Sequence, residues 1–514
     1  MFWGRSMTGE TSDKRSGGGR GESSDARGLV TRSLGAHGAI GLLAGAMLYL
    51  VCLSGMLVVV HHEWQRWEQP DIAEMEALSP AAMQRAMGEM LAAERAEGLS
   101  PTTHLYLATP AEDMPRGIVT TDHGGAYIGE DGSLQGPEAT PWTQFLIDMH
   151  YYLHLPSVWG MTLVGALGAM MVALALTGVL AHPRIFRDAF RMRVRGQARV
   201  ALTDIHNRLS VWTLPLATAV SLTGAIIGLS IVTSFTVAGT WFGGDQTQVY
   251  TPIFGGEAAP DPAPAPLPDV AAALEDAAAR MPDVVPGLVI AHDPGTAGQH
   301  VQVMGAHERR LIFGEYYNYD AAGNYEGRAG LADGALGQQA ASSVYRLHFG
   351  NFGGLPIKLV YVLLGLAMTV ISGSGVSIWL AKRRQKGLPA ERMQGAWSAL
   401  VWGAPALIAA AAGLRLIGGA TLPLTALFWA AQILLVGIGI WRPAIIGRGL
   451  RGLLALLLLL VGSGHALAHP GASQAALILD GLIILSGLLC ALSLRRAGAG
   501  KALVSTGKPA GSPA

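Results

Sequence analysis

Eight long runs of apolar residues constrain the fold of this chain, because about 20 such residues are enough to cross a bilayer. Half of its 514 residues are hydrophobic and only 14% are charged. The first four runs are separated by long polar segments and the last four by short connections. The runs lie at 36–60, 157–181, 208–232, 355–381, 396–414, 421–441, 452–468 and 475–494. The sequence therefore predicts a mainly α, polytopic membrane protein.

Basic residues gather in segments that would all lie on one side of the membrane. Segment 183–205 carries six arginines against two aspartates, and further basic clusters lie in the N-terminal arm, at 382–395 and after 494. The insert after the first run is acidic instead. Because an excess of Lys and Arg marks cytoplasmic segments, we predict both termini in the cytoplasm and the long inserts on the outer side.

These observations predict an organisation in eleven parts. Each outer insert has a helix signal followed by short strands and Gly turns, which predicts a small α+β module. The parts are a disordered cytoplasmic arm (1–33), transmembrane helix 1 (34–62), an outer insert (63–148), helix 2 (149–182), a basic loop (183–205), helix 3 (206–232), a second outer insert (233–345), helix 4 (346–381), a basic loop (382–395), four additional transmembrane helices (396–494) and a flexible cytoplasmic tail (495–514).

Histidines open the first and third runs at matched positions. His37 and His206 are each followed seventeen positions later by a hydroxyl residue and a glycine, Ser54-Gly55 and Thr223-Gly224. A metal-competent side chain at membrane depth is costly and therefore indicates function. With the orientation above, both histidines lie at the cytoplasmic face, where together they form a candidate inner site.

The second and fourth runs repeat the pattern in the opposite direction. His154 and His348 precede Thr177-Gly178 and Ser372-Gly373 by 23 and 24 positions. They form a candidate outer site. His150, one helical turn before His154, is an alternative outer ligand.

The duplicated hairpin predicts a haem protein, because facing helices and axial histidines are common means of holding haem. His182, at the inner end of the second run, could replace or support an inner ligand. The two cysteines, Cys52 and Cys490, lie in apolar runs, and there is no C-x-x-C-H for covalent attachment. We therefore predict non-covalent haem b, two per chain, with His37, His206, His154 and His348 as axial ligands. No nucleotide-binding motif is present, so the electron donor would be external.

Around these histidines the chain resembles a known family, the PepSY-associated transmembrane proteins, often called iron-regulated membrane proteins. The resemblance covers roughly residues 34–385 and includes the first span and its Trp-containing exit. It is carried by MHYYLHLPSVWG (149–160), TGVLAHPRIFRDAFRMRVR (177–195), LTDIHNRLSVWTLPLATAVSLTGA (202–225) and RLHFGNFGG (346–354).

The resemblance implies a bacterial inner-membrane protein whose outer inserts are PepSY-like periplasmic modules. Some members resemble ferric-siderophore reductases that hold two b-type haems through membrane histidines. The positions matching the family's histidines are His37, His150, His154, His182, His206 and His348. The last four spans lie outside the shared motifs.

Our leading hypothesis is an electron carrier that takes electrons from a quinol or a cytoplasmic reductase and reduces a ferric siderophore or other ferric chelate in the periplasm. The alternative is a binding or regulatory protein whose PepSY modules engage a peptidase or its peptide, with helices that only anchor them. A transporter ranks third, because the spans lack paired acidic residues. Nothing indicates a nucleic-acid partner.

Overall fold

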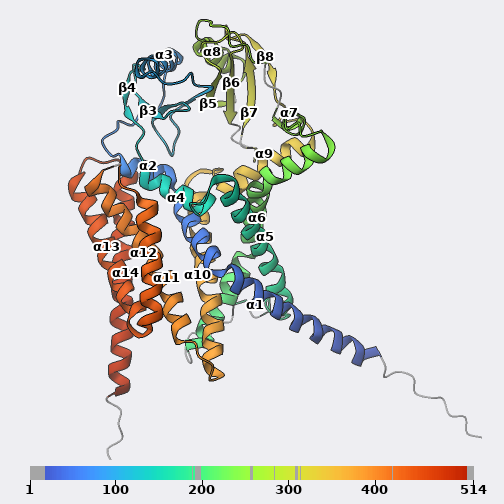
Figure 1. Cartoon of the computed structure of the whole chain (residues 1–514), viewed down its shortest axis with the longest axis vertical. Coiled ribbons are helices and arrows are strands. Elements are labelled where there is room, and N and C mark those ends of the chain that lie inside the picture. Colours follow the sequence, from blue (N-terminus) through green and yellow to red (C-terminus); the bar gives the residue numbers. More distant parts are fainter. Residues whose placement is uncertain are drawn as a thin grey trace, which may run out of the picture.

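The computed structural model consists of a helical body crowned by a head of strands and short helices (Figure 1). It describes residues 18–187, 189–190, 198–254, 259–282, 284–306, 311–312, 314–419 and 421–505. Within this part of the chain, eight helices are long and apolar enough to span a membrane. The prediction of a mainly α, polytopic membrane protein is confirmed.

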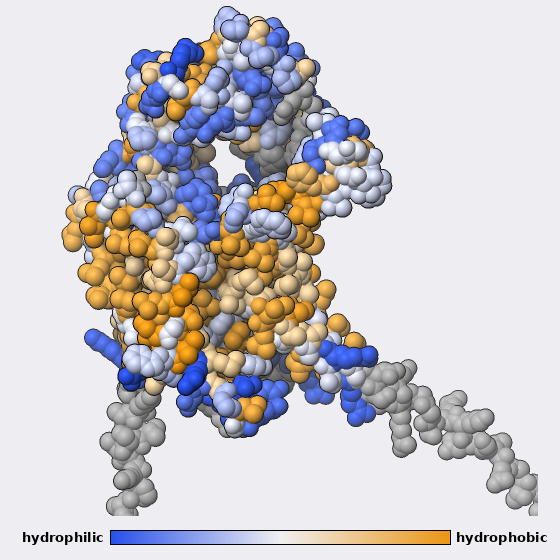
Figure 2. All heavy atoms as spheres, in the orientation of Figure 1, coloured by the Kyte–Doolittle hydropathy of each residue, from blue (hydrophilic) through white to orange (hydrophobic). Residues whose placement is uncertain are grey.

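The eight long helices form the body. Apolar side chains form a broad band across the face of the body seen in Figure 2, while the same face of the head is largely hydrophilic. Such a band is what a bilayer requires of a spanning structure. The helices are α1 (Gly18–Val58), α5 (Ser157–Ala181), α6 (Ala198–Trp241), α10 (Gly354–Gln385), α11 (Glu391–Gly418), α12 (Leu424–Trp441), α13 (Pro443–Ala468) and α14 (Gln474–Ser505).

The predicted helices 149–182 and 346–381 each include the end of a separate helix that precedes the span. The separate helices are α4 (Pro141–Tyr152) and α9 (Leu336–Phe349). Helix α4 ends where Leu153 and His154 have φ angles of 51° and 58°, and α9 ends at Gly350 with φ 70°. Left-handed residues stop a right-handed helix. His150 and His348 therefore lie on short helices outside the spans α5 and α10.

The chain ends also differ from the predicted boundaries. Helix α1 already begins at Gly18, within the arm predicted to be disordered, and α14 continues to Ser505, within the predicted tail. Residues 1–17 and 506–514 lie outside the described residues, as does much of the basic loop 183–205. The described ends of α1 and α14 both lie on the side of the body away from the head (Figure 1).

The two outer inserts fold together instead of forming two separate modules. Their strands make one antiparallel eight-stranded sheet in the order β4-β3-β2-β1-β5-β6-β7-β8. The inserts join where β1 pairs with β5, with His104 opposite His292. The strands are β1 (His104–Ala108), β2 (Gly117–Thr120), β3 (Gly125–Ile128), β4 (Leu134–Pro137), β5 (Val285–His292), β6 (His300–Ala306), β7 (Glu315–Tyr319) and β8 (Tyr325–Arg328).

One helix from each insert packs on this sheet, as the sequence predicts. Helices α3 (Pro80–Glu97) and α8 (Val270–Arg280) share a buried apolar core with the strands. Strand alternation places Leu105 and Leu107 in that core and turns Tyr106 to the other face. Two further short helices, α2 (His61–Glu68) and α7 (Thr247–Phe254), follow α1 and α6. The fold is thus a duplicated unit with four helices added after it.

Candidate haem sites at two histidine pairs

The inner histidine pair forms as predicted. His37 on α1 and His206 on α6 have ring centroids 6.4 Å apart, with the ring planes at 88°. His37 Nδ1 lies 3.0 Å from the carbonyl oxygen of Leu174, and His206 Nδ1 lies 3.1 Å from that of Ile371. A carbonyl oxygen can only accept, so each Nδ1 carries the proton and each Nε2 keeps its lone pair.

The outer pair consists of His150 and His348. Their ring centroids are 6.2 Å apart and the ring planes are nearly parallel, at 20°. His150 Nδ1 donates to Val51 O and His348 Nδ1 to Val220 O, each at 3.0 Å. Burial, and then the nearby His348 ring, lowers the pKa of His150 to about 4. Burial also lowers the pKa of His348. Both rings are therefore neutral at pH 7, as a metal ligand must be.

All four histidines bind the same backbone motif. The accepting carbonyl belongs to a residue three positions before a Ser or Thr, whose hydroxyl donates to the same carbonyl, and a glycine follows the hydroxyl. Each glycine faces the imidazole ring of its histidine. The motifs are Val51–Gly55 for His150, Leu174–Gly178 for His37, Val220–Gly224 for His348 and Ile371–Gly375 for His206. Carbonyls that fix the tautomer of a ligating histidine are typical of metal sites.

The hydroxyl-glycine pair that receives a histidine on the fourth span lies two residues beyond the pair noted in the sequence. Ser374-Gly375, and not Ser372-Gly373, receives His206. Gly373 lies against the Tyr49 ring instead. The sequence count started from His154, whereas His150 is the counterpart of His348; Thr177 lies 27 positions after His150, and Ser374 lies 26 positions after His348.

The preference for His154 as the partner of His348 is also wrong. The Nε2–H of His154 donates to Phe145 O at 2.8 Å, and its Nδ1 accepts from Trp429 Nε1 at 3.0 Å. Both ring nitrogens are thus used, and no lone pair remains for a metal. His154 instead ends α4 in the left-handed conformation, one turn beyond His150.

A cavity of about 370 Å³ opens beside the inner pair. His37, His206 and His182 all line it, so His182 adjoins the site without facing another histidine ring. Most of the remaining lining is apolar or glycine, including Gly38, Gly41, Gly45, Gly178 and Gly375. Small residues allow a flat ligand to lie against helix backbone.

The donor set favours a macrocyclic iron group over a bare metal ion. Within the described part of the chain, no group of three or more His, Cys, Asp or Glu side chains could hold a metal ion. Each pair offers two imidazole nitrogens and nothing more, which suits the two axial positions of a haem. Metal–imidazole bonds of about 2 Å place two rings on opposite sides of one metal at about 6 to 6.5 Å between centroids. The separations of 6.4 and 6.2 Å agree with that value.

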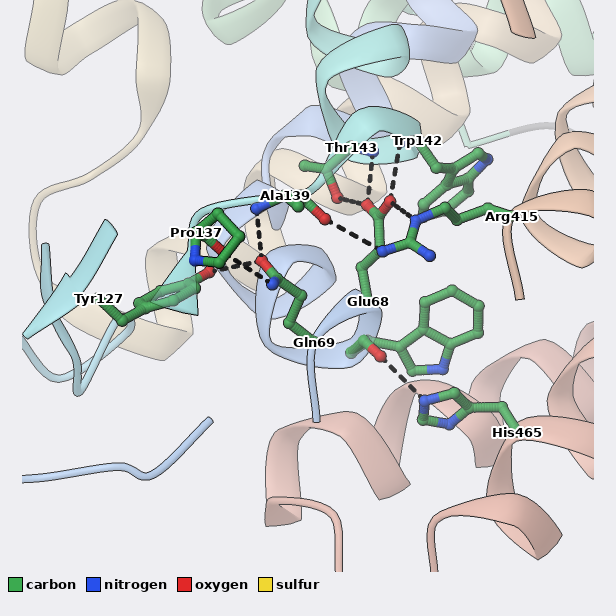
Figure 3. A network of polar contacts seen from close by, with 10 residues as sticks. Glu68, Gln69, Tyr127, Pro137, Ala139, Trp142, Thr143, Arg415 and His465 are labelled. Carbon is green, nitrogen blue, oxygen red and sulfur yellow. Dashed lines mark hydrogen bonds and ion pairs between the residues drawn. The ribbon is translucent and has the colours of Figure 1, made fainter. Parts of the chain in front are cut away.

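Sequence reasoning missed a buried polar network where α2 meets the four C-terminal helices (Figure 3). Glu68 forms an ion pair with Arg415 of α11, with the two side chains 2.9 Å apart. His465 lies in α13 and contacts Asp480 of α14 at 2.9 Å. The Trp67 ring stacks on His465, with 4.4 Å between centroids. The lone carboxylate at Asp480 was the one available signal of this network.

The glycines of the motif make a direct prediction. A Cβ added at Gly224 would lie 2.7 Å from His348 Cε1, whereas at Gly239 of the same helix it would meet nothing within 4 Å. We expect Gly224→Ala to displace the His348 ring and cost about 1–3 kcal/mol, as overpacking does. Gly239→Ala is the matched control and should be neutral or slightly stabilising. Thermal unfolding in detergent measures both, and equal midpoints would contradict the assignment of Gly224 to ring packing.

Taken together, the spans, the duplicated histidine motif and the outer sheet define a polytopic membrane protein with two histidine pairs in its helical body. The family model described as PepSY-associated TM region matches residues 34–382, about two thirds of the chain. The chain therefore belongs to that family, as the resemblance implied. It is also 29% identical over 344 residues to an uncharacterized protein of Pseudomonas aeruginosa, PA4219, covering 62% of this chain and 80% of that relative.

Proposed function

We propose that the protein is an inner-membrane electron carrier that holds two b-type haems and reduces a ferric siderophore or other ferric chelate on the periplasmic side. The observation that carries this proposal is the repeated histidine geometry. At each end of the body, two imidazoles from different repeats face one another, each with Nδ1 held by a carbonyl and Nε2 left to bind.

The residues present fit the implied cofactor. His37 and His206 would hold one haem, and His150 and His348 the other. The inner cavity, with its glycines and apolar lining, supports a flat hydrophobic group beside the inner pair. Bound there, haem would supply reversible one-electron chemistry. The protein holds each histidine in the ligating tautomer.

The spacing of the two pairs suits transfer across most of a membrane. On α1, fourteen residues separate His37 from Val51, whose carbonyl receives His150, and α6 has the same spacing from His206 to Val220. At 1.5 Å per residue this is about 21 Å. Electrons would enter from a quinol or a cytoplasmic reductase at the inner pair and leave at the outer pair, beneath the head. The ferric ion of the chelate would gain one electron and become the more labile ferrous ion.

The positive charges support this orientation. The C-terminal end of α10, whose last turn carries Lys382, Arg383 and Arg384, lies away from the head (Figure 1), and such residues favour the cytoplasmic side. A binding or regulatory protein, with the joined inserts recognising a peptidase or peptide, remains the alternative function. The continuous sheet offers such a protein a recognition surface. A binding function, however, would not require four histidines in one tautomer.

The test is a pair of absorption spectra of the protein purified in mild detergent, oxidised and reduced with dithionite. We expect a sharp b-type α-band on reduction and two haems per chain by the pyridine assay. Ferric chelate added to the reduced protein should then abolish the band. A spectrum without haem, from cells with ample haem, would refute the proposal and favour the binding protein.

The two pairs should also be distinguishable by electron paramagnetic resonance. The inner ligand planes are nearly perpendicular, at 88°, and the outer ones nearly parallel, at 20°. The angle between axial imidazole planes sets the anisotropy of a low-spin ferric haem. We therefore expect two low-spin signals, the inner one with the larger anisotropy. A single signal from a protein with two haems would contradict this geometry.

A further inference from the structure

Two of the four C-terminal helices, α11 and α12, contact both ends of the helix that carries His150. At the start of α4, the Glu68 carboxylate accepts hydrogen bonds from the backbone N–H groups of Trp142 and Thr143, each at 2.9 Å. It also accepts from the Thr143 hydroxyl. An acidic group at a helix N-terminus satisfies unpaired N–H donors and complements the helix dipole.

Arg415 fixes that carboxylate. Its Nε lies 2.9 Å from Glu68 Oε1, and its Nη2 donates to the carbonyl of Ala139, just before α4, at 3.1 Å (Figure 3). The Glu68 side chain is fully buried, so its charge needs this partner. The arginine of α11 therefore ties α2 and the beginning of α4 to the C-terminal helices.

The C-terminal end of α4 is held by α12. Trp429 donates to His154 Nδ1, and Phe428 packs edge-on against Phe145 with 5.4 Å between ring centroids. His154 in turn donates back to Phe145 O. Between the two ends, Trp142 Nε1 donates to Ile408 O of α11 at 3.2 Å. Hydrogen bonds at Ala139, Trp142 and His154 thus join α4 and its flanking residues to α11 and α12.

We propose that α11 and α12 act as a clamp that fixes the direction of α4 and keeps the His150 ring opposite His348, with Glu68, Arg415, Trp429 and His154 as positioning residues. The link to electron transfer rests on the proposed function, whereas the clamp itself does not. The family model ends at residue 382, before α11 begins. The clamp therefore gives these added helices a role that simple anchoring would not require, because an anchor needs no polar contact with α4.

The asymmetry between the two repeats supports this reading. Helix α9, which carries His348, continues through Gly350 to α10, and Tyr361 of α10 donates to Leu347 O. Its position is thus fixed from within its own repeat. Helix α4 instead takes part of its polar support at both ends from residues beyond the repeats, Arg415 before its start and Trp429 after its end. Removing one of these contacts should therefore make α4 and His150 more mobile and leave α9 and His348 unchanged.

The test uses the full-length protein with Trp429→Phe, which keeps the ring and removes the N–H, and Arg415→Met, which keeps the apolar stem. Gln432→Leu is the matched control, because Gln432 is buried in α12 and bonds to Ala399 O of α11 without touching α4. The first readout is hydrogen–deuterium exchange of the haem-free protein. We expect α4 amides to exchange roughly tenfold faster in Arg415→Met, while α9 amides are unchanged.

The second readout is the electron paramagnetic resonance of the haem-loaded protein. Trp429→Phe should shift the signal of the nearly parallel outer pair and leave the inner signal as in the wild type. Unchanged α4 exchange in both variants, with Gln432→Leu also unchanged, would overturn the clamp. Faster exchange throughout the helical body would overturn it as well, since it would show general destabilisation. Absence of haem would refute the proposed function and leave the exchange result to decide the clamp.

Discussion

Replacing His150 with alanine is expected to remove one of two haems, whereas replacing His154 with alanine is expected to leave both. His150 is the residue whose ring lies 6.2 Å from that of His348, with Nδ1 held by Val51 O. Without it, an outer haem would lose one of the two residues that would hold it. We expect about half of the reduced α-band to disappear and ferric-chelate reduction to cease. Haem content per chain and reduction of a ferric chelate measure the two effects.

His154→Ala serves as the control because the residue lies only one helical turn away. It removes a hydrogen bond to Trp429, so a change in the outer signal is expected, but not the loss of the group. His206→Ala should remove the inner haem and keep the outer one. If His154→Ala lost haem and His150→Ala kept it, the outer ligand would be the residue that the repeat spacing favours, and the observed pairing would be refuted.

The sequence was sufficient to predict the membrane-spanning fold and most of the histidines that form the two pairs. Apolar runs of bilayer length are hard to mistake, and four of the six candidate histidines face one another in pairs. The spacing could not decide between His150 and His154, because residues four apart share a helical face. The decision depends on Leu153 and His154, whose left-handed backbone turns the second ring away. No residue type there announces such a turn, since neither is glycine.

Contacts between distant parts of the chain could not be predicted from the sequence. The joining of the two inserts depends on β1 pairing with β5, which lie almost two hundred residues apart and read as ordinary strands. The Glu68–Arg415 pair is likewise invisible, because each residue alone reads as a charge near the end of a helix. Patterns within one segment reveal helices and strands, but not which charge another segment will bury.

A large loss of stability is expected when the buried contact between His465 of α13 and Asp480 of α14 is removed. Both ring nitrogens of His465 face oxygen atoms: Nδ1 lies 2.9 Å from Asp480 Oδ2, and Nε2 lies 2.9 Å from Trp67 O. The Asp480 carboxylate and the Trp67 carbonyl thus hold the His465 ring at both of its nitrogens. Trp67 Nε1 donates to the other carboxylate oxygen at 2.8 Å. All three residues are buried.

Asp480→Ala should therefore destabilise the protein by about 2–6 kcal/mol, because it leaves one buried polar atom of His465 and one of Trp67 without a hydrogen-bond partner, at about 1–3 kcal/mol each. Asp480→Asn should cost much less, because the amide keeps an acceptor for Trp67 Nε1 and a polar group beside His465 Nδ1. Thermal unfolding in detergent separates the two variants, with Ser486→Ala of the same helix as a control at an exposed site. Equal losses for alanine and asparagine would show that an amide cannot replace the carboxylate in this network, and would contradict the expectation.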